Sequence, residues 1–174
     1  QTMNYEDLLT WVLFYTTIFK THKTSMVDVI DPAGLVRSQV IENEEGSLRI
    51  TLNGVENQRT LAGHFIAEGF GSATQHIALA TNDIFATLNT LKGNGFQTLV
   101  ISPNYYDDLE ARFGVDDKLL DRLRAGNILY DRDETGEYFQ VYSQNYGEGF
   151  FFEIIERRGD YKGYGAANAQ FRIA

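Results

Sequence analysis

The stretch "FFFEIIERRG", residues 150–159, places one glutamate, Glu153, in the middle of a run of phenylalanine and isoleucine. Side chains alternate along a strand, so Phe151, Glu153 and Ile155 share one face of a predicted strand, and the opposite face is also apolar. Both faces are therefore expected to be buried. An unpaired buried carboxylate is costly, so Glu153 requires a proton, a cationic partner such as Arg157 or Arg158, or a metal ion.

The length and charge of the chain limit what it does. Its 174 residues predict one domain, residues 1–174, with a sizeable core. The net charge of −9 and the pI near 4.7 argue against nucleic acid and membrane surfaces as partners. The absence of cysteine excludes disulfides and thiolate metal sites and fits a reducing compartment. With no apolar run long enough for a membrane span, the sequence predicts a soluble cytoplasmic protein.

The hydrophobic pattern predicts an internal repeat of one helix and three strands. In the first half, residues 4–19 predict an amphipathic helix with apolar Leu8, Leu9, Val12, Leu13 and Phe19. Short extended segments and further helices follow along the chain. Strands are expected at 26–31, 35–42, 47–53, 74–81, 96–101, 127–132, 137–143 and 149–156, and helices at 57–71, 82–95, 105–113 and 116–126.

This order predicts an α+β fold built from two βαβββ modules. Module one covers about residues 1–70 and module two about residues 71–174. The opening strand of module one is expected to be missing, because the chain begins only a few residues before its first helix. Two such modules would curl their sheets into a cupped, partly closed barrel, whose mouth is a natural pocket.

His76 is the second polar candidate inside a predicted strand. In "TQHIALAT", alternation puts His76, Ala78 and Ala80 on one face, which leaves open space in front of the imidazole. A hydrogen-bonded core histidine is the ordinary explanation. Because His76 and Glu153 lie on the first and last strands of one module, they are also candidates for a shared site. Imidazole plus carboxylate is the ligand set of non-haem iron centres.

Common catalytic motifs are mostly absent. There is no P-loop, no dinucleotide fingerprint and no nucleophile elbow. The segment 131–142 begins like a calcium loop, but its twelfth residue is Tyr142 instead of glutamate. Thr135 and Gly136 are better explained as a hairpin turn.

Several stretches carry a family resemblance. The segments "TQHIALATNDIFATL", "YYDDLEARF", "FQVYS" and "FFFEIIERRGDYKGYGAAN" resemble the catalytic half of 4-hydroxyphenylpyruvate dioxygenases, in the vicinal oxygen chelate superfamily. Residues 104–133 and the ending "GYGAANAQFRIA" are similar to the dioxygenase-like C-terminal domain of two-domain bacterial 3-dehydroshikimate dehydratases. In those proteins the dehydratase chemistry is attributed to an N-terminal barrel, so the resemblance implies a partner domain that this chain lacks.

The resemblance assigns expected roles to individual residues. His76 and Glu153 match two metal ligands, and the implied cofactor is a divalent metal, Fe(II) first, with Mg, Mn or Co as alternatives. The remaining pocket matches are Ser38, Asn53 and Gln140 as polar positions and Phe151 as an aromatic wall, with ordinary polar strand or turn positions as the alternative for the first three. The third ligand of the family, a histidine, is expected upstream of Gln1, and neither His22 nor His64 matches it.

Two functions remain open at this point. The favoured one is a metal-binding, non-catalytic domain that supports folding, oligomerisation or regulation of an adjoining dehydratase domain. The alternative is an active Fe(II)-dependent 4-hydroxyphenylpyruvate dioxygenase, which performs oxidative decarboxylation and ring hydroxylation on an aromatic 2-oxoacid. The implied ligand is accordingly a small aromatic compound or a 2-oxoacid, and self-association is left open.

Overall fold

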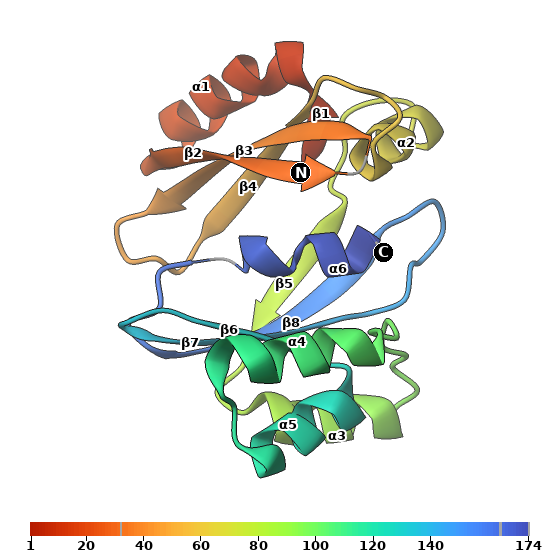
Figure 1. The fold of residues 1–174 in the computed structure, drawn as a ribbon. Coiled ribbons are helices and arrows are strands. Elements are labelled where there is room, and N and C mark those ends of the chain that lie inside the picture. Colours follow the sequence, from red (N-terminus) through yellow and green to blue (C-terminus); the bar gives the residue numbers. More distant parts are fainter. Residues whose placement is uncertain (32, 164, 174) are drawn as a thin grey trace. The chain divides into compact units, whose positions relative to one another are not determined.

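A computed structural model describes residues 1–31, 33–163 and 165–173. The chain forms two compact units: an N-terminal unit, Gln1–Gln75 with Gly147–Phe150, and a C-terminal unit, His76–Tyr146 with the chain from Phe151 onward. Each unit contains one four-stranded sheet with helices (Figure 1). The α+β class is therefore confirmed, and the strand pairs of the described residues form two separate sheets, not one closed barrel.

The N-terminal unit corrects one expectation. Its sheet has the order β1-β4-β3-β2, and β1 pairs in parallel with β4. The opening strand is therefore present, but it has only three residues. On the edge of β1 that faces away from β4, the Thr2 N–H donates to the Ala73 carbonyl oxygen and the Ala73 N–H donates to the Thr2 carbonyl oxygen, which fixes this short strand in place. The elements of the unit are β1 (Thr2–Asn4), η1 (Tyr5–Asp7), α1 (Leu8–Ile18), β2 (Thr21–Asp31), β3 (Gly34–Asn43), β4 (Arg49–Val55) and α2 (Leu61–Glu68).

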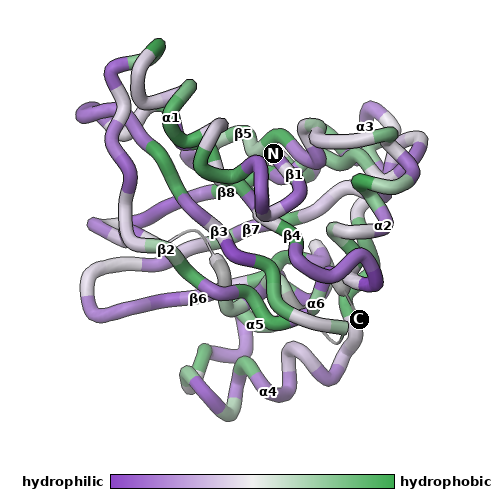
Figure 2. Tube along the Cα trace, turned by 90° about the horizontal axis from the view of Figure 1, so that it is seen from above, coloured by the Kyte–Doolittle hydropathy of each residue, from purple (hydrophilic) through white to green (hydrophobic). Residues whose placement is uncertain are grey.

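Helix α1 is apolar on its exposed side as well as on its buried side. Leu8 is buried with Ile41 and Leu52 of the sheet, as a helix facing a core requires. However, Leu9 and Leu13 are 75% and 67% exposed, so the amphipathic pattern expected for this helix is wrong. The reason is that α1 contains no charged residue, and hydrophobic residues recur along its length (Figure 2), with both buried Leu8 and exposed Leu9 and Leu13 among them.

The C-terminal unit repeats the topology of the first. Its sheet has the order β5-β8-β7-β6, with β5 parallel to β8, so the predicted duplication is confirmed. In Figure 1, α3, α4 and α5 lie on one side of this sheet and α6 on the other. The elements are β5 (His76–Ala80), α3 (Ile84–Gly93), α4 (Pro103–Phe113), α5 (Asp117–Gly126), β6 (Leu129–Arg132), β7 (Gly136–Tyr142), β8 (Phe151–Gly159), η2 (Ala166–Asn168) and α6 (Gln170–Ile173).

The three long helices of this unit close its main core. Asp83 caps α3 and Asp116 caps α5, and each side chain accepts hydrogen bonds from two backbone N–H groups. Leu88, Leu109 and Leu123 then pack on the helix-facing side of the sheet. No described helix has both the length and the hydropathy that a bilayer crossing requires.

The strand expected at 96–101 does not form. β6 occupies this edge of β7 over Glu137–Gln140, so the segment meets the sheet only past the end of β6. There it forms an isolated bridge between Thr98 and Ser143, and Leu99 N–H donates to the Tyr142 carbonyl oxygen at 2.8 Å. The hairpin predicted at Thr135 and Gly136 is confirmed: Asp133 Oδ1 accepts the backbone N–H groups of both residues, which connects β6 to β7.

Gly136 provides a test of this packing. A Cβ on Gly136 would lie 2.1 Å from the Arg158 carbonyl oxygen and 2.7 Å from the Tyr161 nitrogen, both backbone atoms. We expect Gly136→Ala to lower the free energy of unfolding by about 2–3 kcal/mol because the β7–β8 backbone must move. Gly93→Ala is the matched control, since Gly93 lies in α3 with open space around it, and should be neutral or stabilising by up to about 1 kcal/mol. Urea unfolding followed by circular dichroism measures both, and equal effects would contradict the packing argument.

Candidate functional site

Parallel pairing of β5 with β8 brings His76 and Glu153 together. The register pairs His76 with Phe151 and Ala78 with Glu153, so all four side chains lie on one face of the sheet. His76 Nε2 lies 3.9 Å from Glu153 Oε2, beyond hydrogen-bonding distance. Glu153 is only 6% exposed. Two groups with lone pairs thus face each other inside the C-terminal unit.

The two oxygens of Glu153 have different surroundings. Gln140 Nε2 donates to Oε1 at 2.7 Å, and the Tyr138 hydroxyl donates to the same oxygen at 3.3 Å. Both of these bonds end on Oε1, and Oε2 is the oxygen that points toward His76. The neighbours on β7 therefore orient the carboxylate and leave its second oxygen directed at the imidazole.

A buried chain of hydrogen bonds fixes the Gln140 amide. Asn168 Nδ2 donates to Gln140 Oε1 at 2.8 Å, and the Tyr105 hydroxyl donates to Asn168 Oδ1 at 3.2 Å. Because its oxygen is thus occupied, Gln140 presents its NH₂ group to Glu153. Gly165 passes so close that a Cβ there would lie 2.3 Å from Gln140 Oε1, which explains a residue without a side chain at this position.

Burial shifts the pKa values of both central groups toward their neutral forms. It raises the pKa of Glu153 to about 7, although Gln140 and Tyr138 partly oppose the shift by hydrogen bonding to the carboxylate. Burial lowers the pKa of His76 to about 4, and the positive charge of Arg172 acts in the same direction. At neutral pH the imidazole is thus a free base, as metal binding requires.

The arginines proposed as salt-bridge partners of Glu153 are engaged elsewhere. Arg158 pairs with Glu156 at 2.6 Å. The Arg157 guanidinium lies over the Tyr138 ring and donates to the Gly163 carbonyl oxygen. Among the described residues, no arginine or lysine lies within ion-pair distance of Glu153, and the nearest basic group is the neutral imidazole of His76 at 3.9 Å.

Phe151 contacts both the neutral imidazole of His76 and the guanidinium of Arg172. Its ring stacks on His76 with centroids 4.8 Å apart, and Arg172 Cζ of α6 lies 3.4 Å from the Phe151 centroid. The sequence reasoning did not identify Tyr138, Tyr142, Asn168 or Arg172. Alternation along β7 would have found the two tyrosines, because they lie two residues on either side of Gln140. Nothing in the local pattern marks Arg172.

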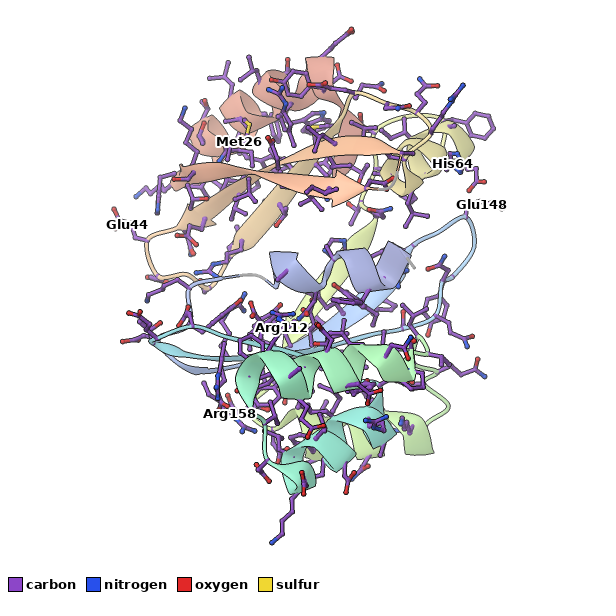
Figure 3. The ribbon with its side chains drawn as sticks, in the orientation of Figure 1. Met26, Glu44, His64, Arg112, Glu148 and Arg158 are labelled. Carbon is purple, nitrogen blue, oxygen red and sulfur yellow. The ribbon has the colours of Figure 1, made fainter. Side chains whose placement is uncertain are left out.

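The other predicted site residues lie in the N-terminal unit. Ser38 Oγ donates to Asn53 Oδ1 at 2.6 Å across β3 and β4, so these two are paired with each other, and their pocket role stays a prediction. His22 lies 3.7 Å from Glu42, and His64 is exposed on α2 (Figure 3).

The donor set fits part of a metal site. Glu153 Oε2 and His76 Nε2 are suitable ligands for a divalent cation. His76 Nδ1 is buried without a hydrogen-bond partner, whereas a ligating histidine usually donates from its second nitrogen. Across residues 1–31, 33–163 and 165–173, no group of three His, Cys, Asp or Glu side chains is placed to hold a metal. The described residues therefore supply two ligands.

The family can now be assigned. The model of the Glyoxalase/Bleomycin resistance protein/Dioxygenase superfamily matches residues 2–141. The chain belongs to this superfamily. Within the superfamily, it is 45% identical over 170 residues to a 3-dehydroshikimate dehydratase of Pseudomonas putida, covering 97% of this chain and 27% of that protein. It is also 31% identical to a 4-hydroxyphenylpyruvate dioxygenase of Legionella pneumophila, covering 92% of this chain and 47% of that protein.

A solved structure of this superfamily has both parts in one chain. It is described as a xylose isomerase-like TIM barrel/4-hydroxyphenylpyruvate dioxygenase fusion protein, and it superposes with a TM-score of 0.80 at 43% identity. The match covers 99% of this chain and 27% of that one. The resemblance inferred from the sequence is thereby confirmed, and the chain spans about a quarter of the fusion protein and of the dehydratase it matches.

The buried carboxylate predicts a pH-dependent stability in chelator-treated protein. Its folded-state pKa of about 7 exceeds the usual 4.5, so the folded state retains a proton that the unfolded state releases. The proton on Glu153 therefore stabilises the folded state: its contribution to the free energy of unfolding is complete below pH 4.5 and is lost as the pH rises to about 7. As the pH rises from 4.5 to 7, we expect the free energy of unfolding of Glu153→Gln to increase by about 3 kcal/mol relative to that of wild type.

Measuring the difference between the two proteins removes the effect of titrating groups far from residue 153. His76 is a direct neighbour whose titration has the opposite sign, so the same comparison is also made in a His76→Ala background. Exposed Glu134→Gln is the control and should track wild type across the same range. Urea unfolding at several pH values provides the free energies. A constant difference between Glu153→Gln and wild type would show that the carboxyl titrates normally.

Proposed function

We propose that this chain is the metal-binding, dioxygenase-like C-terminal domain of a bacterial 3-dehydroshikimate dehydratase, and that it acts as a non-catalytic support for an adjoining dehydratase domain. The observation that carries the proposal is the 45% identity to the Pseudomonas putida dehydratase, which extends over 97% of this chain but 27% of that protein. The partner is then an N-terminal domain, and the location is cytoplasmic.

The Glu153–His76 pair supports the metal-binding part of the proposal. A buried carboxylate with one oxygen directed at a neutral imidazole is stabilised by a cation bound between them. His76, Glu153 and one further histidine would complete the 2-His-1-carboxylate set typical of non-haem Fe(II), and Mg, Mn and Co are the alternative ions. Such an ion would supply a Lewis acid with open positions for a ligand.

An active 4-hydroxyphenylpyruvate dioxygenase is the second candidate, favoured by the 31% identity to the Legionella enzyme. In this case, Gln140 and Tyr138 hold the carboxylate of Glu153 in place, and Phe151 forms an apolar wall beside it. Their buried positions exclude water around the ligand. The substrate class would be an aromatic 2-oxoacid.

Metal content tests the site directly. We expect Glu153→Ala and His76→Ala each to remove most of the Fe, Mn, Co or Mg that remains on the purified chain after dialysis, because each removes one ligand. The bound metal of wild type should also increase as pH rises toward 7, since the proton on Glu153 must leave before the cation binds. Elemental analysis by mass spectrometry provides the stoichiometry.

His64→Ala is the matched control, because His64 is an exposed histidine on α2, and it should retain the wild-type metal content. Circular dichroism establishes that all variants are folded. Unchanged stoichiometry in both ligand variants would reject the metal site.

Oxygen uptake separates the two functions. If the domain is a support, Fe(II)-loaded protein with 4-hydroxyphenylpyruvate should consume oxygen no faster than Glu153→Ala. Uptake that depends on Glu153 would replace the favoured proposal with the dioxygenase. The reading frame of the natural gene gives independent information: a barrel domain encoded upstream of Gln1 supports the dehydratase assignment.

A further inference from the structure

Arg172 has an unusual position for a cationic side chain. It extends from α6 over the ring of Phe151, with Cζ 3.4 Å from the ring centroid and 5.2 Å from the centroid of Tyr142. Its Nη2 donates to Asn145 Oδ1. The guanidinium is therefore held in one orientation by two aromatic rings and one amide.

Two nitrogens of this guanidinium lack partners. Nε and Nη1 are both buried, and neither has a hydrogen-bond acceptor. Together they carry three N–H donors, and buried donors of a charged group are costly to leave unpaired. Burial also lowers the pKa of Arg172 to about 10, still high enough for the side chain to be charged at neutral pH. Among the described residues, no anionic hydrogen-bond acceptor is bonded to these two nitrogens.

The Arg172 guanidinium and the Glu153–His76 pair are linked through Phe151. Phe151 contacts both Arg172 and His76, so the cation and the imidazole adjoin the same ring. Arg172 is also near enough to Glu153 to oppose the rise in the pKa of that carboxyl, although no ion pair joins them. A divalent cation bound to this pair would bring two positive charges, and Arg172 brings a third. Glu153 offsets only one of them, so the site would carry a net positive charge that favours an anionic ligand.

We propose that Arg172 is the carboxylate-binding residue of this site and that it selects an organic acid as the ligand. The carboxylate accepts the free N–H groups at Nε and Nη1, while the rest of the molecule is directed toward the Glu153–His76 pair. Arginine is suited to this role because its charge-assisted bonds to carboxylates are strong and directional. The assignment of an organic acid as the ligand rests on the proposed function of this site, but the contact between Arg172 and the carboxylate requires no metal.

The test uses chelator-treated 174-residue chain and the shape-matched probes benzoate and benzamide. Titrations followed by ¹H–¹⁵N NMR report binding through the amide signals of Phe151 and Arg172. We expect wild type to bind benzoate at least about tenfold more tightly than benzamide, since only benzoate provides a charged acceptor. Arg172→Leu should reduce this ratio to about one, and Arg172→Lys should retain part of it because the positive charge remains.

Arg122→Leu is the matched control. The Arg122 guanidinium also lies over a phenylalanine ring, that of Phe85, but it belongs to α5 and is exposed. Arg122→Leu should leave the ratio of benzoate affinity to benzamide affinity unchanged. A ratio near one in wild type, a ratio that survives Arg172→Leu, or an equal loss in Arg122→Leu would each overturn the proposal. Because metal is absent, failure of the metal site leaves these outcomes unaffected, and metal content reports on that site separately.

Discussion

The buried carboxylate of Glu153 is the constraint on which the C-terminal unit depends. Removing a carboxylate from water raises its pKa to about 7, and the surrounding side chains only partly offset this cost. Gln140 and Tyr138 donate to one oxygen, Asn168 fixes Gln140, and Tyr105 in turn donates to Asn168. One hydrogen-bond network around this carboxylate thus connects residues of β7, β8, α4 and η2.

The repeated topology explains where this group lies. In both units the first strand pairs in parallel with the last, which places residues from the start and end of a module side by side. In the C-terminal unit this pairing joins His76 to the strand that carries Glu153. In the N-terminal unit, the corresponding strand has three residues, and the polar side chains of Ser38 and Asn53 on its sheet are hydrogen-bonded to each other.

Membership of the superfamily and the chemistry of the site are separate conclusions. The match to the family model and to relatives of two different activities establishes the fold and its ancestry. Function depends on the side chains, and here the described residues combine two ligand-type groups with an arginine whose donors are unpaired. Sites of this kind vary within one fold, because a few substitutions on a rigid sheet change the ligand without altering the core.

The sequence by itself determined the α+β class, the duplicated modules, most element positions and the shared face of Phe151 and Glu153, because strand alternation and capping are local properties. It also indicated that Glu153 needed a partner. Only the tertiary structure decided which partner, since the β5–β8 register brings together residues 77 positions apart, such as His76 and Glu153. The failure of residues 96–101 to form a strand, the presence of β1 and the place of Arg172 likewise depend on which edges and side chains other segments already occupy, and local patterns do not contain that information.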